Sequence, residues 1–162
     1  MSTPLPTELA ALAPLLGSWS GRGRGHYPTI EPFEYREHVT FGHVGKPFLT
    51  YAQRTTAADD GRPLHAEMGY VRMPQAGRLE LVLAHPTGIT EVDEGTIEVT
   101  DRTLTIDLSS TAIGRTASAK VVTELQRAIR LTGDTLTYTI RMAAVDQPLQ
   151  DHLAATLTRV AA

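Results

Sequence analysis

The stretch GSWSGRGRGHYPTI, residues 17–30, alternates between two unlike sets of side chains. Its odd positions up to Tyr27 carry glycine, tryptophan and tyrosine, whereas its even positions up to His26 carry serine, arginine and histidine. Because neighbouring side chains of a strand point to opposite faces, the pattern predicts a strand with one polar face and one nearly bare face. Glycines gathered on one face of a strand indicate a sharp bend or the close approach of another group.

This stretch does not fit a nucleotide-binding loop. Its glycines are spaced GxGxG rather than GxGxxG, and Pro28 follows where the dinucleotide fingerprint requires a helix. A flexible linker is disfavoured as well, because Trp19 and Tyr27 keep the strict alternation. We therefore interpret the stretch as a strand inside a folded domain.

The composition is typical of one globular domain. The chain has 162 residues, of which 41% are hydrophobic and 20% charged, with a net charge of −3. No basic excess points to nucleic acid, and no apolar run is long enough to span a bilayer. Cysteine is absent, which excludes disulfides, thiolate metal sites and covalent c-type haem attachment. With no signal peptide recognisable, we expect a single domain over residues 1–162, located in the cytoplasm.

Short alternating segments separated by turn signals make up most of the chain. Only residues 7–16, TELAALAPLL, have helical spacing, and Pro14 limits them to a short helix or helical turn. Turns such as DDG at 59–61 and GD at 133–134 separate about ten predicted strands without helical crossovers. The sequence therefore predicts an all-β fold, an antiparallel up-and-down barrel of about ten strands that encloses a ligand cavity. A β-sandwich is the alternative architecture.

Two histidines are candidates for chemistry. His85 shares its parity with a run of leucines at positions 79, 81 and 83, so it could point inward. His152 shares its parity with small residues at positions 154, 156 and 158, which would leave room for a flat ligand. Parity does not decide which face of this last strand is inside, because Leu153 and Leu157 lie on the other one.

Other polar residues carry weaker signals. No HExxH motif and no GxSxG elbow is present, so neither a hydrolytic zinc site nor a serine nucleophile is indicated. Lys120 and Arg127 could meet a carboxylate at a barrel mouth or lie on the surface. The remaining histidines and one group of carboxylates are expected on the solvated surface: His26, His38, His43, His65, Glu91, Asp93 and Glu94.

Four segments together resemble the nitrobindins, in order and over about residues 12–160: LLGSWSGRGRGHYPTI, GKPFLTYAQRT, LHAEMGYVR and PLQDHLAATL. The most specific piece is a GxWxGxG motif, here Gly17, Trp19, Gly21 and Gly23, combined with PLQxHL around His152. Nitrobindins are small haem b-binding barrels, similar in fold to calycins such as the fatty-acid-binding proteins.

The resemblance implies one ferric haem b per chain, held without covalent attachment. It implies that His152 is the proximal axial ligand of the haem iron and that the GxWxGxG strand lies near the haem. It also implies that Thr29 lines the pocket and that Lys120 pairs with a haem propionate. The implied activity is isomerisation of peroxynitrite to nitrate together with nitric oxide binding, with no catalytic residue beyond the haem iron.

Several alternatives remain open from the sequence. The same barrel could serve as a non-enzymatic nitric oxide or haem sensor or carrier, as a carrier of lipid or another small apolar ligand, or as a zinc hydrolase. Small molecules are the expected partners, rather than nucleic acid or a membrane. The oligomeric state is left open, with a homodimer as one option.

Overall fold

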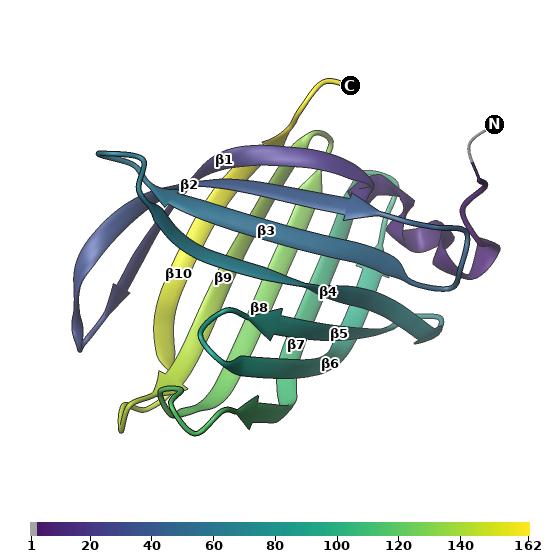
Figure 1. Ribbon diagram of the computed structural model, residues 1–162. Helices are drawn as coiled ribbons and strands as arrows, with labels where there is room; N and C mark the ends of the chain where they lie inside the picture. Colours follow the sequence, from purple (N-terminus) through teal and green to yellow (C-terminus); the bar gives the residue numbers. More distant parts are fainter. Residues whose placement is uncertain (1–2) are drawn as a thin grey trace.

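Ten strands form a single closed barrel in the part of the chain that the structure describes, residues 3–162 (Figure 1). The structure is a computed structural model, and residues 1–2 of the predicted domain lie outside the described part. Each strand pairs antiparallel with its neighbours in sequence, and β1 pairs with β10 to close the barrel. The strands are β1 (Gly17–Tyr27), β2 (Ile30–Gly42), β3 (Leu49–Ala57), β4 (Pro63–Gln75), β5 (Arg78–His85), β6 (Ile89–Val99), β7 (Thr103–Arg115), β8 (Val122–Thr132), β9 (Thr135–Ala144) and β10 (Gln150–Arg159). The predicted up-and-down barrel is confirmed, and the sandwich is excluded.

A short 3₁₀ helix, η1 (Thr7–Leu15), precedes the barrel and lies where β1 begins (Figure 1). Its leucines at positions 9, 12 and 15 are fully or almost fully buried, because a period of three residues per turn places them on one face. The indole Nε1 of Trp19 donates to the carbonyl of Leu15 at 2.8 Å and fixes the helix to the barrel. The predicted N-terminal helical turn is thus confirmed. No helix of the described residues is both long and apolar enough to cross a membrane.

The bare face of β1 is covered by aromatic side chains of β2. Gly23 pairs with Tyr35 and Gly25 pairs with Phe33 across the two strands. A Cβ atom on Gly23 would collide with the Tyr35 ring, and one on Gly25 would collide with the Phe33 ring. The predicted close approach is therefore real, and the approaching groups are the protein's own rings.

The interior changes character along the barrel axis. We call the end where β1 begins the η1 end, and the end where β1 stops and β10 begins the His152 end. On β3, Leu49 near the η1 end is fully buried in the apolar core, and Gln53 further along is buried and polar. The polar and charged residues buried in the barrel are Glu37, Gln53, Thr55, Glu67, Glu91, Asp93 and Arg127. A ten-stranded barrel is wider than its own apolar side chains can fill. In this barrel, charged groups occupy the middle.

Candidate functional site

His152 is half-buried and lies at an irregularity in β10. Ala155 and Leu157 are buried while Thr156 and Thr158 are exposed, so regular alternation would point His152 outward. The register of β10 with β9 shifts between Asp151 and Leu153, which leaves His152 without a partner on β9. Such a bulge re-aims a side chain. The imidazole consequently lies edge-on to the buried ring of Tyr27, with centroids 5.3 Å apart and an interplanar angle of 74°.

The hydrogen bonding of His152 leaves one ring nitrogen available. Its Nδ1 lies 3.0 Å from the carbonyl oxygen of His26, and since a carbonyl can only accept, Nδ1 carries the proton. Burial lowers the pKa of His152, which favours the neutral imidazole. A neutral imidazole whose Nδ1–H is held by a backbone carbonyl presents the Nε2 lone pair, which is the form that binds a metal.

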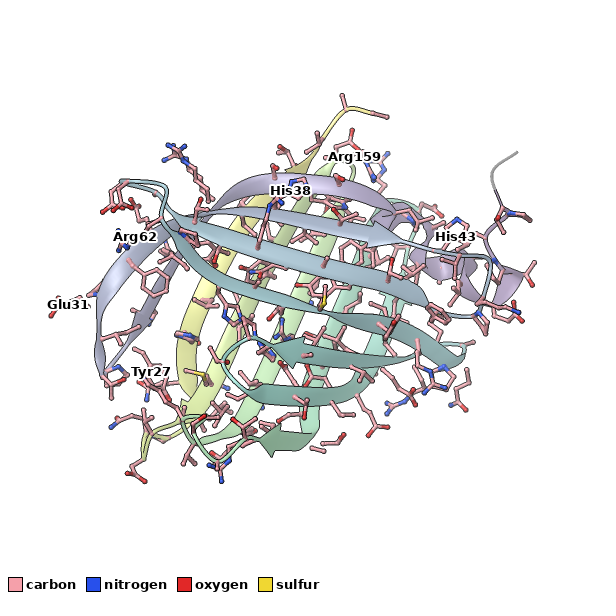
Figure 2. The ribbon with its side chains drawn as sticks, viewed as in Figure 1. Tyr27, Glu31, His38, His43, Arg62 and Arg159 are labelled. Carbon is pink, nitrogen blue, oxygen red and sulfur yellow. The ribbon has the colours of Figure 1, made fainter. Side chains whose placement is uncertain are left out.

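The Tyr27 side chain packs beside this histidine and is held by hydrogen bonds to β9. Its hydroxyl accepts from the backbone N–H of Ala144 at 2.9 Å and lies 3.1 Å from the carbonyl oxygen of Met142. These bonds join the end of β1 to the end of β9. Figure 2 shows Tyr27 at one end of the barrel and His43 at the other, so the His152 site and η1 lie at opposite ends.

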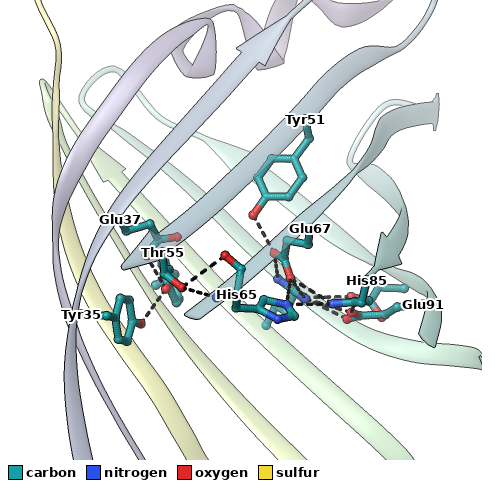
Figure 3. A network of polar contacts seen from close by, with 11 residues as sticks. Tyr35, Glu37, Tyr51, Thr55, His65, Glu67, His85 and Glu91 are labelled. Carbon is teal, nitrogen blue, oxygen red and sulfur yellow. Dashed lines mark hydrogen bonds and ion pairs between the residues drawn. The ribbon is translucent and has the colours of Figure 1, made fainter. Parts of the chain in front are cut away.

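Arg127 lies at the centre of a buried ionic network, of which Figure 3 labels Glu67 and Glu91. Its guanidinium donates twice to Glu67, at 2.9 and 3.1 Å, and twice to Glu91, at 2.9 Å each. Burial alone would raise the pKa of both carboxyls, yet the Arg127 charge holds the pKa of each below its usual range. Both carboxylates are therefore ionised at neutral pH, and all three side chains are fixed.

Two further carboxyl groups near this network take up protons instead. Burial raises the pKa of Glu37 to about 7, although its hydrogen bond from Tyr138 at 2.6 Å opposes the rise. Burial and the neighbouring Glu91 charge raise the pKa of Asp93, and neither Asp93 oxygen has a hydrogen-bond partner among the described residues. The nearest cation, Arg127 Nε, lies 3.5 Å from one Asp93 oxygen, and a buried carboxyl without hydrogen bonds is cheaper to bury in its neutral form.

A pair of histidines extends the network towards the His152 end. His65 Nε2 lies 3.1 Å from His85 Nδ1, and His85 Nε2 lies 2.8 Å from a Glu91 carboxylate oxygen. The expectation that His85 points inward is confirmed, since its side chain is 8% exposed. The expectation of a surface position for His65 holds only in part, because its side chain is 33% exposed and its other side lies against the ionic network (Figure 3).

Sequence reasoning missed most of the buried charges. Glu91 and Asp93 were expected on the surface, and both are fully buried, while Glu94 is exposed as expected. Arg127 lies neither at a barrel mouth nor on the surface. One signal in the sequence could have located Glu91 and Asp93. Both have the same odd parity as the buried Ile97 on β6, which indicates that all three side chains face inward.

The structure separates the predicted cofactor residues into two groups. Gly17 and Trp19 lie at the η1 end, where the Arg159 guanidinium stacks 4.2 Å from the Trp19 ring. Six residues of extended strand, roughly 20 Å, separate Trp19 from Gly25, the position paired with Leu153 next to His152. Trp19 packs in the apolar core and Gly17 starts the strand, so neither is near His152.

The other predicted cofactor residues lie closer to His152. Thr29 is exposed in the turn that follows β1, and Lys120 is exposed just before β8, at the end of the barrel that also holds His152. Gly21 and Gly23 lie midway along β1, where Gly21 approaches the backbone of Thr156. A cavity of about 700 Å³ opens beside this end; Gly25, His26 and Phe33 are among its lining residues, and His152 is not.

Known proteins resemble this chain over almost its full length. Residues 8–159 match the family model described as the THAP4-like, haem-binding β-barrel domain. The chain is 64% identical over 159 residues to peroxynitrite isomerase 1 of Mycolicibacterium paratuberculosis, covering 98% of this chain and 99% of that protein. It is 58% identical over 158 residues to peroxynitrite isomerase of Nocardia farcinica, covering 98% and 94%. The crystal structure of Rv2717c from M. tuberculosis superimposes with a TM-score of 0.96 at 57% identity, covering 98% and 100%.

Proposed function

The chain belongs to the THAP4-like, haem-binding β-barrel family, the nitrobindins, and from this we propose that it binds ferric haem b through His152 and isomerises peroxynitrite to nitrate. The observation that carries the proposal is the hydrogen bond from His152 Nδ1–H to the His26 carbonyl at 3.0 Å. It commits one ring nitrogen and leaves Nε2 as a metal ligand. Cysteine is absent, so such a haem would be held without thioether bonds.

The residues at the His152 end fit a haem. The donor is a neutral imidazole, which is the proximal ligand of many haem proteins. The Tyr27 ring packs edge-on against the imidazole, and the Tyr27 hydroxyl is itself held by β9. Lys120 is exposed near this end and would pair with a propionate, and Thr29 would border the group. We assign no haem contact to Gly17 or Trp19, which lie at the η1 end.

Ferric haem, held by His152, would supply the iron chemistry that converts peroxynitrite to nitrate. The chain's own contribution is to hold the iron through Nε2 and to fix the imidazole plane through the His26 carbonyl. It also keeps the proton of His152 on Nδ1, so that Nε2 stays deprotonated near neutral pH. No side chain needs to transfer a proton, since peroxynitrite and nitrate have the same composition.

The buried ionic network disfavours a lipid carrier. An arginine inside a barrel could hold a fatty-acid carboxylate, but four hydrogen bonds to Glu67 and Glu91 already occupy the Arg127 guanidinium. An apolar chain in the middle of the barrel would also displace ionised groups that need their partners. A nitric oxide or haem carrier would share the haem site and differ only in lacking the isomerase activity.

The experiment that tests the proposal compares wild type, His152→Ala and His43→Ala after haem is added. His43 is the matched control, since it lies at the opposite end of the barrel (Figure 2). We expect a ferric Soret band in wild type and His43→Ala and its loss or displacement in His152→Ala. Stopped-flow mixing with peroxynitrite should then show faster decay to nitrate with haem-loaded wild type than with free buffer. Equal Soret bands in all three proteins would refute His152 as the haem ligand. Haem binding without faster peroxynitrite decay would favour a nitric oxide or haem carrier over an isomerase.

A further inference from the structure

Three donor atoms converge where β4 and β5 approach the His152 end (Figure 3). They are His65 Nε2, Glu67 Oε2 and His85 Nδ1. The two nitrogens are 3.1 Å apart, and the carboxylate oxygen lies 3.7 Å from the His65 nitrogen and 3.5 Å from the His85 nitrogen. The group does not include His152, whose ring is held by β1 and β10.

These separations fit a metal ion better than a set of direct hydrogen bonds. Zinc bonds to nitrogen and oxygen are about 2.0–2.2 Å, so a tetrahedral site separates its donors by about 3.3–3.6 Å. The three measured separations bracket this value. Only the nitrogen pair is within ordinary hydrogen-bond range, while the carboxylate oxygen is aimed at both rings from too far away to accept strongly from either.

The neighbours of the three residues orient them as metal ligands. His85 Nε2 lies 2.8 Å from a Glu91 oxygen, so its Nε2–H donates to this carboxylate and its Nδ1 keeps a lone pair. A carboxylate that holds the far nitrogen of a histidine is a usual second partner of a metal ligand. Glu67 is held by Arg127 and by the Tyr51 hydroxyl at 2.7 Å, which fixes the carboxylate that faces the histidines.

The local charge also favours a cation. Two buried carboxyl groups, those of Glu67 and Glu91, share the single Arg127 guanidinium, so acidic groups outnumber the one fixed cation here. An excess buried charge is costly unless a counter-charge balances it. The His65 side chain is 33% exposed, so an ion can reach the cluster from solvent.

We propose that His65, Glu67 and His85 form a binding site for a divalent transition metal, with Zn²⁺ as its best match, separate from the haem ligand His152. Two imidazoles and one carboxylate suit zinc, and three protein ligands leave a fourth position for water. In the metal-bound form His65 would carry its proton on Nδ1, and both converging nitrogens would present lone pairs.

The test is equilibrium dialysis of the haem-loaded full chain against Zn²⁺, followed by elemental analysis of zinc and iron per chain. We expect about one zinc per chain in wild type and in His43→Ala, and loss of this zinc in His65→Ala and in His85→Ala. His152→Ala should lose iron and keep zinc, so failure of the haem proposal and failure of the zinc proposal are distinguishable.

A second measurement excludes misfolding as the cause. Zinc at 100 times its dissociation constant should raise the free energy of unfolding of wild type by about 2.7 kcal/mol and leave His65→Ala unchanged. His65→Ala should keep its Soret band, which shows that the barrel is intact. Wild type without bound zinc, or zinc retained by both His65→Ala and His85→Ala, would overturn the proposal and leave a hydrogen bond between two imidazoles.

Discussion

Glu37 should make the barrel less stable as pH rises, and Glu37→Gln should remove this effect. The carboxyl is 4% exposed, and burial raises its pKa to about 7, against 4.5 for the free side chain. Its pKa is higher in the folded state, so between these two values the unfolded chain loses the proton first. The free energy of unfolding therefore falls as pH rises through this window. The whole shift corresponds to about 3 kcal/mol, of which roughly 2.5 kcal/mol lies between pH 5 and pH 8.

Urea unfolding of wild type and Glu37→Gln at pH 5 and pH 8 measures this contribution. The glutamine can still accept from the Tyr138 hydroxyl, and contributions from the histidines are shared by both proteins and cancel in the difference. We expect the variant to gain about 2 kcal/mol relative to wild type between the two pH values. Glu34→Gln, at an exposed position of the same strand, should show the same change of unfolding free energy with pH as wild type. A difference between wild type and Glu37→Gln that stays constant or shrinks with pH would refute the reasoning.

Three other substitutions test the packing and the network by denaturant unfolding. Gly23→Ala places a methyl group against the Tyr35 ring and should cost about 1–3 kcal/mol, whereas an unchanged midpoint would show that this ring moves freely. Arg127→Met leaves Glu67 and Glu91 buried without their cation and should lower the free energy of unfolding by about 3–5 kcal/mol. Changing both glutamates to glutamine in this variant should restore part of the loss, and a loss below about 1 kcal/mol would contradict the network. The Arg159 guanidinium stacks on Trp19 and donates to the carbonyls of Leu16 and Pro14. Arg159→Lys keeps the charge but loses these contacts, so it should lower the free energy of unfolding by about 1–2 kcal/mol. Unchanged stability would show that charge alone matters.

Local alternation was enough to predict the barrel. Period-two patterns and turn residues mark the strands, and strands joined by short connections pair with their neighbours, as all ten do here. The bare face of β1 correctly indicated a close approach, since the Tyr35 and Phe33 rings occupy the space. These features depend on contacts between adjacent strands, which a sequence pattern records directly.

The polar interior was not predictable in the same way. On β4 the apolar residues at even positions include Met68 and Tyr70, which are 63% and 50% exposed. The inward positions carry His65 and Glu67 instead, so the usual assignment of the apolar face to the core is reversed over this part of the strand. Arg127 meets Glu67 from 60 residues away and Glu91 from 36 residues away, and no local pattern connects them. Likewise, the irregularity at His152 involves the register of β10 with β9, which alternation along β10 does not record.

The hydrogen bonds of individual histidines then separate ligands from structural residues better than burial does. His38 has Ser20 Oγ 3.1 Å from Nδ1 and Thr40 Oγ1 3.4 Å from Nε2, so both of its nitrogens are engaged by hydroxyls. His152 and His85 each have one nitrogen committed to an oxygen that can only accept, the His26 carbonyl and the Glu91 carboxylate.

An acceptor of this kind fixes the tautomer and leaves the other nitrogen with a lone pair. The same arrangement therefore prepares His152 for the haem iron and His85 for a second metal ion. Because the two histidines are oriented by different strands, each can be tested without disturbing the other.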